Sequence, residues 1–122
     1  FKEGLHTITM KGVTGAQAIK DIMAALRKNP AKELAGLKVL KVRDYDADVV
    51  TDMATGEKSS TGLPKSNVLY FDLENDSWCC ARPSGTEPKI KFYMGVKGTS
   101  LQDSEEKLEA LKNAVLAMIP EV

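Results

Sequence analysis

The stretch from residue 68 to residue 96, VLYFDLENDSWCCARPSGTEPKIKFYMGV, decides the expected fold. Two mostly apolar segments, 68–73 and 78–81, are separated by Asn75-Asp76, a dipeptide that tolerates the positive φ of a tight hairpin. Residues 89–96 then alternate between apolar and polar side chains, which predicts a half-buried strand with one polar face. The stretch therefore predicts a hairpin followed by a further strand, with a polar loop between them.

The flanking sequence predicts two more strands and two helices. Alternation predicts strands over 5–11 and 37–45. A first helix is expected after a cap at Thr14, ending near Asn29, and a second after a cap at Thr99 or Ser100. Their apolar stripes comprise Ile19, Ile22, Met23 and Leu26 in the first helix and Leu108, Leu111, Val115 and Met118 in the second.

Residues 49–67 carry Thr, Ser, Gly, Pro and Lys without periodicity, and they predict a long loop. Strands joined by a hairpin and flanked by two amphipathic helices predict an α+β fold. We expect an antiparallel sheet of about four strands with two main helices on one face.

Composition limits the possible functions. With 122 residues, 43% of them hydrophobic and 28% charged, the chain fits one domain spanning residues 1–122. Lys and Arg total 17, and so do Asp and Glu, so the net charge of zero disfavours a nucleic-acid-binding role. Because the chain begins at Phe1 rather than at a methionine, we expect it to be a fragment of a longer protein.

The two cysteines, Cys79 and Cys80, are adjacent in a predicted strand and point to opposite faces, so they cannot easily form a disulfide. Without a signal-like segment, this predicts a cytoplasmic protein. Apolar runs are too short to span a bilayer, so no membrane partner is expected.

The loop of residues 82–89 has the composition of a phosphate site. Arg82 offers a planar fork for two phosphate oxygens, Ser84 and Thr86 offer hydroxyls, and Gly85 lets the backbone approach a ligand. Lys89 and Lys91 add positive charge on one side of the following strand. An ordinary polar turn has a similar composition, and Glu87 would repel an anion, so the residues alone leave both interpretations open.

The run RPSGTEPKIKFY, residues 82–93, resembles the C-terminal phosphate-binding loop of the phosphoglucomutase and phosphomannomutase family, the α-D-phosphohexomutases. The passages AGLKVLKVRDYD, LPKSNVLYFDLENDSW and LKNAVLAMIP resemble the same family's last domain, so the resemblance covers essentially the whole chain. It implies the fourth domain of a four-domain enzyme, with a fold similar to that of the TATA-box-binding protein.

The resemblance also implies a function. Such enzymes, intramolecular phosphotransferases of the isomerase class, interconvert hexose 1-phosphate and hexose 6-phosphate through a bisphosphorylated intermediate. The phosphoserine, the Mg²⁺ site and the sugar-reading loop belong to the preceding domains, so we expect no catalytic residue, metal or cofactor in this domain and no activity from it alone. The implied phosphate contacts are Arg82, Ser84, Gly85 and Thr86, with Lys89 and Lys91 at basic positions of the pattern, and the implied partners are a hexose phosphate and the preceding domains.

Two other interpretations of the sequence remain. A stand-alone anion-binding or nucleic-acid-binding module would also be compatible with an α+β sheet. Asp44, Asp46 and Asp48 alternate in a way that suggests a metal site, although the same alternation at the end of a strand predicts one solvated face. Trp78 is expected to pack on the sheet rather than to stack on a sugar.

Overall fold

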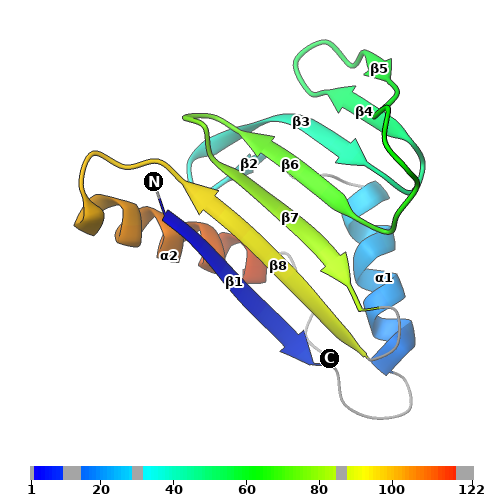
Figure 1. The fold of residues 1–122 in the computed structure, drawn as a ribbon, viewed down its shortest axis with the longest axis horizontal. Helices are drawn as coiled ribbons and strands as arrows, with labels where there is room; N and C mark the ends of the chain where they lie inside the picture. The colour runs from blue at the N-terminus through cyan, green and yellow to red at the C-terminus, as the bar shows by residue number, and fades with distance from the viewer. Residues whose placement is uncertain (1, 10–14, 29–31, 85–87, 118–122) are drawn as a thin grey trace.

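The computed structural model describes residues 2–9, 15–28, 32–84 and 88–117, and it confirms the α+β class. An antiparallel sheet has the strand order β1-β8-β7-β6-β3-β4-β5, with β2 paired to β3 at its side (Figure 1). The elements in chain order are β1 (Lys2–Thr9), α1 (Gly15–Lys28), β2 (Glu33–Leu34), β3 (Leu37–Asp44), β4 (Val49–Asp52), β5 (Lys58–Ser59), β6 (Leu69–Leu73), β7 (Trp78–Pro83), β8 (Lys89–Val96) and α2 (Leu101–Ala117).

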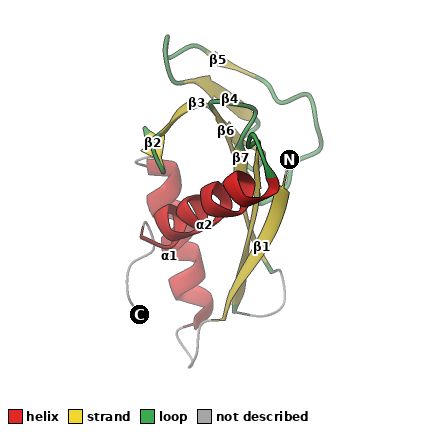
Figure 2. Cartoon of the chain, turned by 90° about the vertical axis from the view of Figure 1, so that its left-hand side faces the viewer, coloured by secondary structure: helices red, strands yellow, loops and turns green. Residues whose placement is uncertain are grey.

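Both helices cover the same face of the sheet, as predicted (Figure 2). In α1 the apolar stripe is buried at every predicted position. In the stripe predicted for α2, Leu111 and Val115 are buried. Met118, the last residue expected in that stripe, lies outside the described residues. These helices pack on alternate residues of the central strands, among them Phe71, Ile90 and Met94. Neither helix is long and apolar enough, over its described residues, to cross a membrane.

The predicted hairpin is confirmed. Strands β6 and β7 pair antiparallel, and the turn between them places Asn75 at a φ of 58° and Asp76 at 55°. The cap of α2 is Ser100, whose Oγ accepts a hydrogen bond from the backbone N–H of Asp103 at 3.1 Å. The cap predicted for α1, Thr14, lies outside the described residues.

The expected count of about four strands was too low, because the described chain forms an eight-stranded sheet. Three of the eight, β2, β4 and β5, have only two to four residues, too few to show a period-2 pattern. Two of these fall in the predicted long loop, where Val50 pairs with Ser59 and Thr51 with Lys58. The loop expected over 49–67 therefore begins with a short hairpin.

Strand β3 does not follow the predicted alternation. Its pairing with β6 shifts between Val39 and Lys41, as a β-bulge does, so that Val39 and Val42 both face the core. Strict alternation would place Leu40 on the same face as Val42, but Leu40 is 47% exposed while Val42 is buried.

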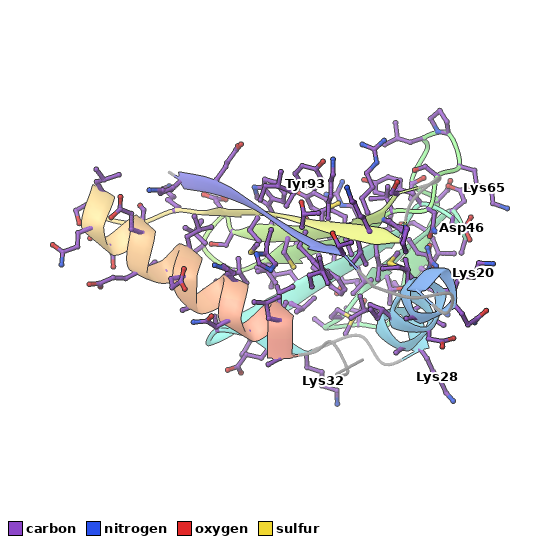
Figure 3. The ribbon with its side chains drawn as sticks, turned by 90° about the horizontal axis from the view of Figure 1, so that it is seen from below. Lys20, Lys28, Lys32, Asp46, Lys65 and Tyr93 are labelled. Carbon is purple, nitrogen blue, oxygen red and sulfur yellow. The ribbon has the colours of Figure 1, made fainter. Side chains whose placement is uncertain are left out.

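No helix of the described residues covers the side of the sheet away from α1 and α2, and we call this side the open face. Figure 3, viewed along the sheet, shows Tyr93 of β8 on this side, with the helices on the other. On β8 the buried residues alternate with Lys89, Lys91 and Tyr93, so these three side chains belong to the open face.

Candidate phosphate-binding site

Strands β7 and β8 bring most of the predicted phosphate contacts together at one end of the sheet. Arg82 is the cross-strand partner of Lys91. Beyond the end of β7, the backbone N–H of Ser84 donates to the carbonyl oxygen of Lys89 at 2.9 Å and closes the loop. Gly85 and Thr86, the other two predicted contacts, lie outside the described residues, as does Glu87.

Arg82 and Lys91 form what we call the cation pair, on the open face beside the loop. Both side chains are exposed, and within the described part of the chain neither makes an ion pair. Like charges directly opposite each other on neighbouring strands destabilise a sheet. An anion bound between the two side chains would remove that repulsion, and the guanidinium of Arg82 can donate two parallel hydrogen bonds to it.

Strand β1 extends this row on the other side of β8. Thr7 is the cross-strand partner of Lys91, and its exposed side chain lies on the same face as the cation pair. The sequence resemblance did not single out Thr7. Only the pairing of the first strand with β8, a contact between distant parts of the chain, reveals it.

Burial keeps the thiols of both cysteines protonated. Burial raises the pKa of the Cys79 thiol to about 12. It raises the pKa of the half-buried Cys80 thiol to about 11, while the positive charge of Arg82 acts in the opposite direction. Both side chains are therefore protonated thiols near neutral pH. Cys80 lies on the open face, close enough to Arg82 for that charge to affect its pKa.

An aromatic cluster lies on the same face, farther from the loop. The rings of Tyr70 and Trp78 stack with centroids 5.5 Å apart and an interplanar angle of 8°, which confirms that Trp78 packs on the sheet. The guanidinium carbon of Arg43 lies 5.4 Å from the centre of the Tyr70 ring. The Nε of Arg43 also donates to Asp72 at 2.7 Å, and this hydrogen bond is the main reason why the pKa of Arg43 is raised.

The acidic segment does not form the single solvated face that strand alternation predicted. Strand β3 ends at Asp44, so the next residues follow a turn. Asp44 pairs with Nε of Arg27 at 3.1 Å, whereas Asp48, at a φ of 56°, accepts a hydrogen bond from Oγ1 of Thr61 at 2.7 Å. Across the described ranges, no three His, Cys, Asp or Glu side chains are grouped in a way that could hold a metal ion.

Comparison with known proteins finds relatives that share one name. No protein-family model matches the chain. It is 36% identical over 110 residues to proteins named phosphoglucomutase from Staphylococcus saprophyticus and from two strains of Staphylococcus aureus. Each match covers 90% of this chain but only 20% of the relative, so the chain spans one domain-sized part of those proteins.

Proposed function

Because this chain is a homologue of part of the phosphoglucomutases, we propose that it is the C-terminal phosphate-binding domain of such an enzyme. Residues 1–122 form one domain in this proposal, and the rest of a cytoplasmic enzyme supplies the phosphate donor and the Mg²⁺ site. The whole enzyme interconverts hexose 1-phosphate and hexose 6-phosphate through a bisphosphorylated intermediate. This domain holds the phosphate that is not being transferred.

The observation that carries the proposal is the cation pair next to the closed loop. Arg82 and Lys91 are directly opposite each other, exposed on the open face, and without an acidic partner among the described residues. A phosphate dianion offers the opposite charge and a geometry that the guanidinium fork matches. In the proposed site Ser84, Gly85, Thr86 and Lys89 contribute the remaining contacts from the loop and its closing strand.

The contribution of the domain to catalysis is binding and orientation. Contacts with the remote phosphate position the reacting oxygen of the sugar. Binding energy of this kind increases the rate of phosphate transfer. An end domain can also close over the substrate as a lid. Since the sugar must turn around between the two half-reactions, each phosphate in turn occupies the same site. The chain alone binds substrate and does not convert it.

The test is a titration of the 122-residue chain with glucose 6-phosphate, followed by NMR. A few charge-assisted hydrogen bonds, each worth about 1.5–3 kcal/mol, must offset an association cost of about 4–15 kcal/mol. We therefore expect a dissociation constant on the order of millimolar. The largest chemical-shift changes should fall on residues 82–91. If they centre on another part of the sheet, the assignment of this loop is wrong.

A further inference from the structure

Beyond the cation pair along β8, the open face carries Tyr93. Tyr93 follows Lys91 by two residues on β8, which places it on the same face about 6.6 Å further along the strand. Its cross-strand neighbours are Cys80 on β7 and Leu5 on β1. Figure 3 shows Tyr93 on the side of the sheet that no helix covers.

Toward β7 and along its own strand Tyr93 has small neighbours, whereas its partner on β1 is Leu5. Cys80 separates Tyr93 from Tyr70, whose ring is already stacked on Trp78. On its own strand the next open-face position is Gly95, which has no side chain. Tyr93 is half-buried, and its hydroxyl makes no hydrogen bond to any other described residue. The ring therefore presents to a ligand both an apolar surface and a hydroxyl that makes no hydrogen bond to another described residue.

The direction of a bound phosphate ester follows from the positions of Ser84 and Lys89. These two residues are hydrogen-bonded to each other and lie on one side of the cation pair along the strands, whereas the paired residues Cys80 and Tyr93 lie on the other side. When Ser84, Lys89 and Arg82 engage the unesterified oxygens of a phosphate, the ester oxygen points away from Ser84 and Lys89. The group attached to that oxygen then extends over the open face toward Tyr93.

We propose that Tyr93 contacts the sugar of the bound hexose phosphate, an inference that rests on the proposed function. A pyranose presents C–H groups on its faces, and an aromatic ring packs against them without requiring one orientation. Such a contact suits a substrate that binds by either of its phosphates in turn. Tyr93 is in this view a binding residue that favours a ring over an open-chain phosphate ester.

The experiment compares three ligands of the 122-residue chain by NMR titration at constant ionic strength: inorganic phosphate, glycerol 3-phosphate and glucose 6-phosphate. In the Tyr93→Ala chain, affinity for glucose 6-phosphate should fall about 3- to 10-fold, while affinity for the other two stays the same. Tyr93→Phe shows whether the ring alone is sufficient. The matched control is Tyr45→Ala, because Tyr45 follows β3, three strands away from β8.

The outcomes separate the two proposals. If all three ligands weaken equally in Tyr93→Ala, or if none does, the sugar contact is refuted while the phosphate site stands. If the unchanged chain binds none of the three ligands at residues 82–91, the phosphate site itself is refuted, and the sugar contact with it. A selective loss for glucose 6-phosphate that Tyr45→Ala does not reproduce supports the contact.

Discussion

In the proposed site, the shape of the cation at position 82 matters as well as its charge. A guanidinium donates two parallel hydrogen bonds to a phosphate, whereas an ammonium acts as a point charge. We expect Arg82→Lys to weaken the binding of glucose 6-phosphate to this chain by about 10-fold, because one charge-assisted hydrogen bond is lost and the charge is retained. The measurement is the dissociation constant from an NMR titration.

The matched control for this substitution is Arg27→Lys. Arg27 pairs with Asp44 and donates to Asn67, away from the loop, so its replacement should leave phosphate affinity unchanged. Equal weakening in both variants, or none in Arg82→Lys, would contradict a bidentate role for Arg82.

Asp103 links stability to pH at the start of α2. Its pKa is lowered below the ordinary value of 3.8, mainly because the backbone N–H of Thr99 donates to its carboxylate at 2.8 Å, with Lys107 also contributing. A carboxyl whose pKa is depressed by folding stabilises the native state above its unfolded pKa. That contribution is lost as the pH falls through the lower, folded pKa.

We therefore expect Asp103→Asn to be less stable than the unchanged chain near neutral pH. The difference in urea midpoint should shrink progressively as the pH falls below 3.8. The other carboxyl groups titrate in both chains, so the comparison isolates Asp103. A difference that stays constant down to about pH 2 would show that the charge of Asp103 is not its source.

At the scale of secondary structure, the sequence was most informative where periodicity was long and uninterrupted. Alternation along β8 correctly separated the core side from the side with Lys91 and Tyr93. It failed on β3, because a bulge after Val39 adds one residue and reverses the two faces of the strand. No residue in that segment of the sequence indicates the shift. Strands β4 and β5 were missed because pairing with other strands, rather than their own pattern, defines them.

The proposed site was predictable to a similar degree. Arg82 and Lys91 were singled out from a contiguous motif, and the pairing of β7 with β8 explains why they are neighbours. Thr7 was not, because it lies in a strand about eighty residues earlier and reaches the site only through the β1–β8 pairing. Contacts of such high sequence separation leave no trace in a local pattern.

The connection between β8 and α2 depends on a glycine. A Cβ added at Gly98 would lie 2.5 Å from Oγ of Ser104 and 2.6 Å from its backbone nitrogen, which the first turn of the helix holds in place. We expect Gly98→Ala to lower the free energy of unfolding by about 1–3 kcal/mol, because backbone must move to relieve the overlap. Urea unfolding measures the change.

Gly4→Ala is the comparison for that variant. The nearest atom to a Cβ at Gly4 is Cδ2 of Leu108, 3.0 Å away, and a leucine side chain can adjust. Its cost should be clearly smaller than that of Gly98→Ala. If the two variants lose the same stability, close approach to the α2 backbone is not what restricts position 98.

For the molecule as a whole, the placement of charge distinguishes a single phosphate site from a surface that binds nucleic acid. The chain has 17 basic and 17 acidic residues, so its attraction for anions is confined to a local arrangement such as the cation pair. A protein that tracks a nucleic-acid backbone releases many counterions, and its affinity falls steeply with salt. One phosphate held by two or three cationic groups releases few.

We therefore expect the logarithm of the affinity for glucose 6-phosphate to fall as the logarithm of the salt concentration rises. The slope should be no steeper than about −2. Titrations at about 50 and about 200 mM sodium chloride measure that slope, and Lys91→Ala should make it shallower by removing one of the contributing charges. Lys97→Ala is the control, because Lys97 lies just beyond the same strand and pairs with Asp76. A single-stranded oligonucleotide that bound more tightly than the sugar phosphate, with a slope several-fold steeper, would instead favour a nucleic-acid-binding module.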